Sequence, residues 1–207
     1  MPEIVLATRN KGKIKELKSA LIALHPDISV LGLDSFPELG VIPETGSSFA
    51  ENALQKARIV CAHTNRVSLA DDSGLVVPAL NGDPGIFSAR YSGKNATDRD
   101  NNRKLLKEMQ LLEGKKRQAS FVCVLAVCAP NGESVLAEGR WEGKIARSPS
   151  GENGFGYDPV FEDPEQGCTA AELPAGEKMK KSHRARALNR LLDLWPEFWH
   201  RAGQTPG

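Results

Sequence analysis

The spacing of hydrophobic positions changes along the chain, and the changes predict alternating strands and helices. The apolar run at residues 3–7 (EIVLA) predicts a buried strand, and residues 28–33 (ISVLGL) predict a second one. Between them, apolar side chains in residues 11–24 recur at spacings of three and four, which is typical of an amphipathic helix. This order indicates two parallel strands joined by a right-handed crossover.

Helix-capping patterns mark where the next two helices begin. In residues 47–51 (SSFAE), either serine can cap a helix, and Glu51 completes a capping box with the second serine. Residues 97–100 (TDRD) repeat this pattern with a threonine and an aspartate. We therefore predict a helix after each segment, the second ending near Leu112.

The second half of the chain predicts a hairpin, a long irregular region and one more helix. Two runs of β-forming residues, 119–129 and 134–146, are separated by PNGE, whose Asn-Gly pair favours an antiparallel hairpin. Residues 148–181 predict mostly loop. The last helix is expected from about Ser182 until Pro196 ends it.

These elements predict the α/β class, with a mixed central sheet flanked by helices. No linker interrupts residues 1–199, so we expect a single domain whose two lobes enclose a cleft. Residues 200–207 (HRAGQTPG) predict a disordered tail.

Composition narrows the classes of partner and compartment. The 207 residues carry a formal net charge of +1, so no overall field draws the chain to nucleic acid or anionic lipid. No apolar run approaches the ~20 residues of a membrane span, and the N-terminus lacks a signal-peptide pattern. The 4 cysteines form no CxxC and are expected to be reduced thiols. We therefore expect a cytoplasmic protein with neither a nucleic-acid polymer nor a membrane as partner.

The segment ATRNKGKI (residues 7–14) joins the first strand to the first helix, a place where phosphates often bind. It is not a P-loop, because Ala7 stands where the first glycine belongs and Ile14 where the Mg²⁺-binding hydroxyl belongs. The segment still suits an anion, because the N–H groups at a helix N-terminus are unpaired. The alternative is a basic turn without a ligand. The candidate anion ligands are Thr8, Arg9, Asn10, Lys11 and Lys13.

Two adjacent carboxylates lie at the end of the predicted third strand, residues 67–71, and precede a predicted Ser-Gly turn. Adjacent strand residues face opposite ways, so we expect Asp71 and Asp72 to do different jobs. One can face the cleft while the other pairs with backbone or a basic group. A carboxylate at a strand end of an α/β sheet is a frequent Mg²⁺ ligand or general base. The alternative is a turn stabilised by aspartate side chains.

Two late segments suggest how a base and a polyanion could be held. Residues 150–161 (SGENGFGYDPVF) place glycines around Phe155 and Tyr157, and an aromatic on such a loop can stack on a nucleobase. Residues 178–190 (KMKKSHRARALNR) form a basic run with His183 at the start of a predicted helix. The alternatives are an aromatic that fills its own loop and a solvated basic face. With the segments above, these features are what a nucleoside triphosphate requires.

The sequence resembles the inosine/xanthosine triphosphate pyrophosphatase family, whose members hydrolyse aberrant purine triphosphates. The resemblance covers about residues 3–193 and rests on seven blocks in the family's order. The blocks are ATRNKGKIKEL (7–17), ETGSSFAENALQKA (44–57), ADDSGLVV (70–77), PGIFSARYSG (84–93), GFGYDPVF (154–161), TAAEL (169–173) and SHRARAL (182–188).

The resemblance implies Mg²⁺-dependent hydrolysis of dITP, ITP, XTP and dXTP to the nucleoside monophosphate and pyrophosphate. It also implies an elongated, two-lobed α/β fold and a homodimer. Asp72 would be the catalytic carboxylate at the metal, with Glu44 as a second ligand. The residues implied to contact the substrate are Thr8, Arg9, Asn10, Lys11, Gly12, Lys13, Ser73, Phe155, Gly156, Tyr157, Asp158, Lys178, His183 and Arg184.

The chain departs from the family pattern at two positions. Members often have glycine where this chain has Arg9, so the turn here must use a conformation that arginine can adopt. Members often have two acidic residues before Thr-Gly, where this chain has Pro43 and Glu44, so Glu44 alone is left as the second metal ligand.

Two other functions are compatible with the residues. The same basic surface would suit a non-catalytic nucleotide sensor or RNA-binding module, although paired aspartates repel phosphates unless a metal intervenes. A related enzyme acting on modified pyrimidine triphosphates is the other alternative. Pyrophosphate release with and without Mg²⁺ separates the first alternative from the family activity, and a panel of triphosphates separates the second.

Overall fold

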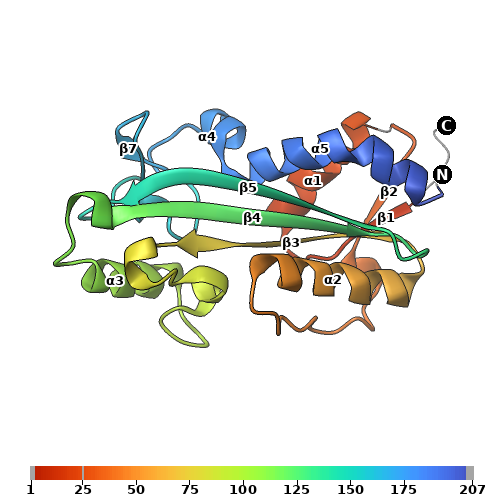
Figure 1. Ribbon diagram of the computed structural model, residues 1–207, viewed down its shortest axis with the longest axis horizontal. Helices are drawn as coiled ribbons and strands as arrows, with labels where there is room; N and C mark the ends of the chain where they lie inside the picture. The colour runs from red at the N-terminus through yellow and green to blue at the C-terminus, as the bar shows by residue number, and fades with distance from the viewer. Residues whose placement is uncertain (1–2, 25, 204–207) are drawn as a thin grey trace. The chain divides into compact units, whose positions relative to one another are not determined.

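The computed structural model describes residues 3–24 and 26–203 (Figure 1). The helices are α1 (Lys11–Leu24), α2 (Phe49–Thr64), α3 (Asp98–Glu108), α4 (Ala175–Lys181) and α5 (His183–Arg201). The strands are β1 (Glu3–Leu6), β2 (Ser29–Gly32), β3 (Val67–Val76), β4 (Gln118–Cys128), β5 (Ser134–Ile145), β6 (Phe161–Asp163) and β7 (Cys168–Thr169). Short 3₁₀ helices are η1 (Leu33–Ser35), η2 (Pro78–Leu80), η3 (Gly85–Arg90), η4 (Gly114–Arg117) and η5 (Asp158–Val160).

The strands form one mixed sheet in the order β2-β1-β3-β4-β5-β6-β7. Strand β1 pairs in parallel with β2 and β3, whereas β6 pairs antiparallel with β5 and β7. The chain divides into two compact units. The first contains residues 1–72, 124–138 and 187–207, and the second contains residues 73–123 and 139–186. Strands β3, β4 and β5 therefore contribute residues to both units.

The first unit is built on parallel strands covered by helices on both faces. Figure 1 shows α2 on one side of these strands and α1 and α5 on the other. Ile4, Val5 and Leu6 of β1 are completely buried, which accounts for the apolar run that predicted this strand. Helix α2 is held to β3 by a hydrogen bond from Ser68 Oγ to the carbonyl of Ala57.

The second unit has an aromatic core. Phe121 of β4, Trp141 of β5 and Phe161 of β6 pack together with ring centroids 4.4–6.3 Å apart. Figure 1 shows α3 on one side of the strands of this unit and α4 on the other. This core is the rigid support for the glycine-rich loop before η5.

Most predicted elements are confirmed, including the mixed sheet and its flanking helices. Helix α1 spans the predicted residues, and Asn-Gly lies in the turn between β4 and β5. Thr97 caps α3 in a complete capping box with Asp100. Ser48 caps α2, but the Glu51 carboxylate bonds Ser47 instead of closing the box on Ser48.

The third strand is longer than the sequence pattern predicted. The expected turn after Asp72 is wrong, because β3 continues through Ser73 to Val76. Leu75 and Val77 are completely buried, and their burial favours an extended backbone over a turn at this point. The two aspartates therefore lie in the interior of a strand and not at its end.

The prediction that Pro196 ends the last helix is also wrong, because α5 continues to Arg201. Proline removes one backbone donor from the helix. Trp195, Phe198 and Trp199 are all buried around it, and their packing outweighs that loss.

Two further expectations concern the irregular segments. The predicted loop 148–181 contains β6, β7 and α4, which are short and lack a clear hydrophobic period. Of the predicted tail 200–207, residues 200 and 201 are helical and 204–207 lie outside the described residues.

The single-domain assignment of residues 1–199 stays a prediction. Among the described residues, no helix combines the length and apolar character that crossing a membrane requires.

Candidate functional site

The turn between β1 and α1 is shaped by its own side chains. Asn10 Oδ1 accepts hydrogen bonds from the backbone N–H groups of Gly12 (3.0 Å) and Lys13 (3.2 Å), so Asn10 caps α1, and these two N–H groups are paired, contrary to the expectation that they are unpaired. Thr8 Oγ1 accepts from the Asn10 N–H at 3.2 Å. The helix N-terminus is thereby held with its positive end beside the cationic side chains of the segment.

Arg9 is tied to a neighbouring loop. Its guanidinium donates to the carbonyl of Leu39 at 2.7 Å and lies 3.6 Å from the Asp34 carboxylate. Among the described residues, positive φ outside glycine occurs at Asn65 and Asn81 alone. Arginine therefore replaces the family's glycine without backbone strain, because this turn does not use a left-handed conformation.

Part of the predicted phosphate segment lines one cavity together with the predicted carboxylates Glu44 and Asp71, whereas Asp72 is not among the lining residues. The cavity has a volume of about 280 Å³, and it lies entirely within the first unit. Its lining contains both cations and carboxylates. Lys13 Nζ forms an ion pair with the buried Asp71 at 2.5 Å. The polar residues that line it are Thr8, Arg9, Lys13, Glu44, Lys56 and Asp71.

Asp71 and Asp72 have different partners, as the alternation of strand side chains predicted. Asp71 pairs with Lys13, whereas Asp72 lies 3.8 Å from Lys56 Nζ and accepts a hydrogen bond from Asn52. Asp72 is 8% exposed. Burial raises the pKa of its carboxyl, the nearby Lys56 and Asn52 oppose this, and the negative charges of Glu44 and Asp71 add to it.

Lys56 joins the two carboxylates that were predicted to hold a metal. Its ammonium lies 2.6 Å from Glu44 Oε1 and 3.8 Å from Asp72 Oδ1. Glu44 and Asp72 thus already share one cation, and carboxylate oxygens are the donors that Mg²⁺ prefers. No group of three or more His, Cys, Asp or Glu side chains that could hold a metal occurs in the described part of the chain. Two carboxylates that converge on one ammonium fit a cation that takes its other ligands from water and phosphate.

Asn52 connects Asp72 to the loop that carries Glu44. Its Nδ2 donates to Asp72 Oδ2 at 3.1 Å, and its Oδ1 accepts from the Gly46 N–H at 2.8 Å. Asn52 is 1% exposed. A Cβ at Gly46 would lie 2.6 Å from Glu51 Cβ and 2.9 Å from Asn52 Oδ1, so this close approach requires glycine.

The predicted base-binding loop is wrapped around an ion pair in the second unit. Asp158 accepts a hydrogen bond from the Phe155 N–H at 2.7 Å and pairs with Lys178. Gly154 has a φ of +81°, and a Cβ there would overlap the Asp158 carboxylate and lie 2.8 Å from Lys178 Nζ. The glycine therefore allows the backbone to pass directly over this ion pair.

Phe155 presents its ring at the surface of this loop. The ring is 57% exposed, and it lies 5.2 Å from Lys178 Nζ and 5.7 Å from the Arg184 guanidinium carbon. His183 is buried and stacks on Phe121, with centroids 4.8 Å apart and planes at 16°. Phe155, Lys178 and Arg184 are thus brought together, with His183 fixed at the start of α5.

Tyr157 has a different place from Phe155. Its ring is 4% exposed, its hydroxyl donates to the Ser88 carbonyl at 2.8 Å, and burial raises the pKa of its phenol. The buried side chain of Tyr157 therefore anchors the loop to the interior of the second unit.

Ser73 follows Asp72 directly in β3 and is half-buried. The side chain of Lys11 lies outside the described residues.

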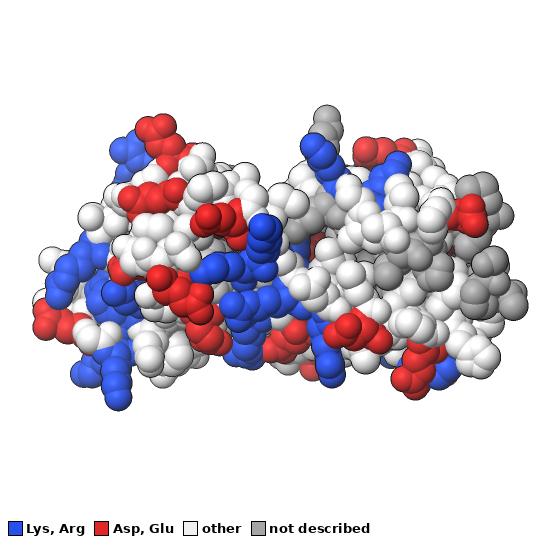
Figure 2. Space-filling view, turned by 90° about the horizontal axis from the view of Figure 1, so that it is seen from above, with Lys and Arg blue, Asp and Glu red and all other residues white. Residues whose placement is uncertain are grey.

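The basic run at residues 178–190 divides into buried and exposed parts. Figure 2 shows lysine and arginine side chains gathered over α4 and the start of α5. Lys180 and Arg186 are exposed, whereas His183 and Arg184 are buried. The run is therefore more than a solvated face.

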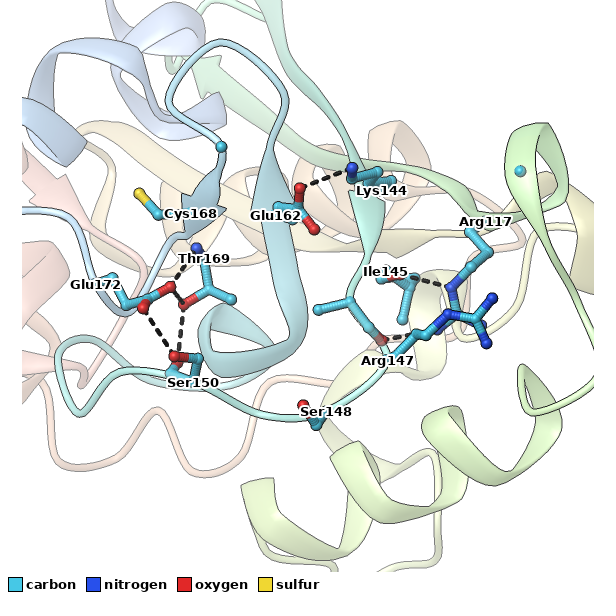
Figure 3. A pocket seen from close by; sticks show the side chains of 13 residues that line it. Arg117, Lys144, Ile145, Arg147, Ser148, Ser150, Glu162, Cys168, Thr169 and Glu172 are labelled. Carbon is cyan, nitrogen blue, oxygen red and sulfur yellow. Dashed lines mark hydrogen bonds and ion pairs between the residues drawn. The ribbon is translucent and has the colours of Figure 1, made fainter.

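A second cavity of about 520 Å³ lies within the second unit. Figure 3 shows that its polar side chains bond one another: Lys144 with Glu162 at 2.7 Å, and Ser150 with Glu172 at 2.8 Å. Arg117 donates instead to backbone carbonyls. None of the predicted site residues that the structure describes lines this cavity.

Comparison with known proteins identifies the family. The model of the Ham1 family matches residues 4–194. The chain belongs to the Ham1 family. A relative from Nitratidesulfovibrio vulgaris, named dITP/XTP pyrophosphatase, is 54% identical over 202 residues, which is 95% of this chain and 97% of the relative.

Solved structures agree with this assignment to the Ham1 family. A HAM1 protein from Coxiella burnetii superposes with a TM-score of 0.89 at 45% identity, covering 95% of this chain and 100% of that one. A nucleoside-triphosphatase/dITP/XTP pyrophosphatase from Mycobacterium abscessus gives a TM-score of 0.80 at 46% identity, covering 92% and 98%. The family resemblance seen in the sequence and the predicted α/β class are both confirmed.

The site of this Ham1-family chain contains two residues that the sequence analysis did not single out. Asn52 and Lys56 lie one turn apart on α2 and contact the same aspartate. The signal was available, because two polar residues at i and i+4 border the apolar stripe of a helix that precedes the aspartates. Reading them required knowledge of which strand α2 covers.

Proposed function

We propose that this Ham1-family chain hydrolyses non-standard purine nucleoside triphosphates, namely ITP, dITP, XTP and dXTP, to the monophosphate and pyrophosphate. The observation that carries the proposal is the pair Glu44 and Asp72, which share the Lys56 ammonium. Glu44 and Lys56 line a cavity together with the cationic turn before α1. A polyanion with a divalent cation complements such a site, because the cation pairs with the carboxylates and the polyanion with the basic side chains. Relatives named dITP/XTP pyrophosphatase support the same activity.

The triphosphate is bound by the segment from Thr8 to Lys13. The cations Arg9, Lys11 and Lys13 would offset the negative charge of the phosphates, whereas the Gly12 and Lys13 N–H groups are already bonded to Asn10. Lys13 is held in place by Asp71, which limits its motion and fixes where its ammonium lies. Lys56 adds a further cation to the same cavity.

Glu44 and Asp72 are the residues that would hold Mg²⁺. When bound, the ion supplies charge neutralisation on the phosphate oxygens. The proposal rests on the donor chemistry and on the cation that both carboxylates already share.

Asp72 acts on the attacking water. Its carboxylate orients the water and accepts its proton while a bond forms between the water oxygen and the α-phosphorus. The bond from the α-phosphorus to the bridging oxygen breaks, and pyrophosphate leaves. In the metal-free site, burial raises the pKa of Asp72, so its carboxylate accepts a proton more readily than a solvated one does. Lys11 and Lys13 offset the charge that grows on the leaving group.

The base and sugar are bound by Ser73 and the loop Phe155–Asp158, together with Lys178, His183 and Arg184. The exposed Phe155 ring stacks on the base. Donors on His183 and Arg184 pair with a 6-oxo group and would be left unpaired opposite the 6-amino group of adenine. Rejection of this kind reaches about 10⁴-fold, so ATP is excluded.

The decisive test is pyrophosphate release from ITP, XTP, GTP and ATP at varied Mg²⁺. We expect turnover of ITP and XTP that requires the metal, with kcat/KM for ATP at least about 10³-fold lower. Equal kcat/KM values for ATP and ITP would contradict the base-recognition part. Binding of ITP without pyrophosphate release at any Mg²⁺ concentration would instead indicate a nucleotide sensor, and turnover of modified pyrimidine triphosphates would indicate the related enzyme.

We also propose that the protein works as a homodimer in the cytoplasm. The cytoplasm holds the nucleotide pool on which such an enzyme acts, and the family resemblance implies the dimer. Sedimentation at several protein concentrations tests the oligomeric state.

Replacing Asn52 with leucine should lower kcat for ITP by about 10- to 100-fold and raise the Mg²⁺ concentration needed for half-maximal activity. The substitution frees the Asp72 carboxylate and the Gly46 N–H at once, so both proposed metal-binding segments lose their common support. Steady-state kinetics across a Mg²⁺ series measures the effect. Arg58→Ala, an exposed change on the same helix, is the control. Unaltered kcat and Mg²⁺ dependence in Asn52→Leu would show that Asp72 does not depend on Asn52.

A further inference from the structure

Two side chains of α3 hold the base-binding loop at Gly156. The Gly156 N–H donates to Asp98 Oδ2 at 2.7 Å, and the Gly156 carbonyl accepts from Asn102 Nδ2 at 2.9 Å. Asp98 and Asn102 are four residues apart and so lie on one face of the helix. Both backbone groups of a single loop residue are thus bound by one helix of the same unit.

Helix α3 is held in position by its N-terminal cap, by its buried apolar side and by contacts with neighbouring residues. The capping box of Thr97 and Asp100 sets its first turn, and Leu105 is completely buried on its apolar side. Asn101, next to Asn102, accepts hydrogen bonds from the N–H and the hydroxyl of Ser92. Asn101 therefore anchors the helix to its neighbours, which leaves Asn102 to act on the loop.

Asn102 lowers the stability of the fold at its position. It is buried, and its Oδ1 has no hydrogen-bond partner in the described structure, although its Nδ2 contacts the loop. A buried acceptor without a partner lowers stability. An apolar side chain would serve the packing of α3 better, so the contact with Gly156 points to a role other than stability.

The loop needs external support because it is rich in glycine. Gly154 and Gly156 both have positive φ, at +81° and +63°, and they flank Phe155 on either side. Glycines restrict the backbone least, so the position of the exposed Phe155 ring depends on what holds its neighbours. Asp158, which is paired with Lys178, bonds the backbone N–H of Phe155, and Asp98 and Asn102 bond the backbone of Gly156.

We propose that Asp98 and Asn102 are positioning residues for base recognition, which place Phe155 by clamping Gly156 to α3. This inference rests on the proposed function, in which Phe155 stacks on the purine. The clamp acts on binding of the base and leaves the chemistry at Asp72 unchanged. It therefore alters KM more than kcat.

The test compares Asn102→Leu and Asp98→Ala with Arg103→Ala, a control on the same helix that contacts Asp100 and not the loop. Steady-state pyrophosphate release from ITP and ATP, thermal unfolding, and hydrogen–deuterium exchange of the Gly156 amide are measured for each. We expect KM for ITP to rise roughly 5- to 10-fold with kcat within about twofold, as for loss of one hydrogen bond. Exchange at Gly156 becomes faster in Asp98→Ala.

Stability separates this role from a purely structural one. Asn102→Leu should unfold at the same or a higher temperature than wild type, because it removes the unpaired acceptor while the half-buried Gly156 carbonyl can bond water. A lower unfolding midpoint together with an unchanged KM would overturn the proposal. If wild type releases pyrophosphate but both variants keep its KM, the clamp alone is wrong. If wild type releases none from any purine triphosphate, the proposed function fails and the clamp's role in base recognition fails with it.

Discussion

Asp72→Asn should lower pyrophosphate release from ITP by on the order of 10³-fold, because the amide can neither accept the proton of the attacking water nor bind a metal as a carboxylate does. The side chain keeps its size, so the hydrogen bond with Asn52 and the burial in β3 remain possible. Rates under saturating Mg²⁺ and ITP measure the loss. Asp71→Asn is the matched neighbour, since it removes the partner of Lys13 and should cost less.

The same variant should not be less stable at neutral pH. Burial raises the folded-state pKa of Asp72 above the unfolded value of about 4. A raised carboxyl pKa contributes stability below the unfolded pKa, and this contribution is lost as pH rises through the folded pKa. At pH 7 the ionised carboxylate therefore disfavours folding, and Asp72→Asn should unfold at an equal or higher temperature, with the gap narrowing toward pH 4. Near-normal turnover in Asp72→Asn would refute the catalytic assignment.

Gly154→Ala should lower kcat/KM for ITP by about 100-fold or more. Its Cβ would overlap the Asp158 carboxylate and crowd Lys178, so the loop must leave the ion pair that fixes Phe155. Separating the buried Asp158 from Lys178 is itself costly, since an unpaired buried charge lowers stability by about 3–5 kcal/mol. Kinetics with ITP and thermal unfolding are both needed to see the two effects.

Gly167→Ala separates the clash from the cost of the backbone conformation. Gly167 also has a positive φ (+66°) and belongs to the same unit, but a Cβ there meets nothing within 4 Å. It should lose about 1 kcal/mol of stability from the left-handed backbone alone, with little change in kinetics. If the two alanine variants lose activity equally, the Asp158–Lys178 pair does not set the loop.

The fold was predictable where local patterns carried it. The periodicity of residues 11–24 gave α1, and the threonine and aspartate of residues 97–100 gave the start of α3. Where packing between residues far apart in the sequence decides where a strand or helix ends, the sequence pattern predicted the wrong end. The continuation of β3 past Asp72 depends on burial of Leu75, and the continuation of α5 past Pro196 depends on buried aromatic side chains.

The candidate site was predictable by residue type more than by partner. The sequence indicated that Asp71 and Asp72 differ, and the structure assigns Lys13 to one and Asn52 with Lys56 to the other. No periodicity indicates which helix covers a strand, so α2 was not linked to the aspartates. For the same reason, contacts such as that of Asn102 with Gly156 were not foreseeable from one sequence.

The buried guanidinium of Arg117 has a consequence for how mutations in this chain should be interpreted. It donates to the carbonyls of Ile145 and Ala146 at the end of β5 (Figure 3). It also donates to those of Met109 and Leu112, just beyond α3. A lysine would keep the charge, but it has no planar fork to reach these oxygens together. In a screen for lost activity, Arg117→Lys would therefore score as inactive because less of the protein folds. The nucleotide chemistry itself would be unchanged.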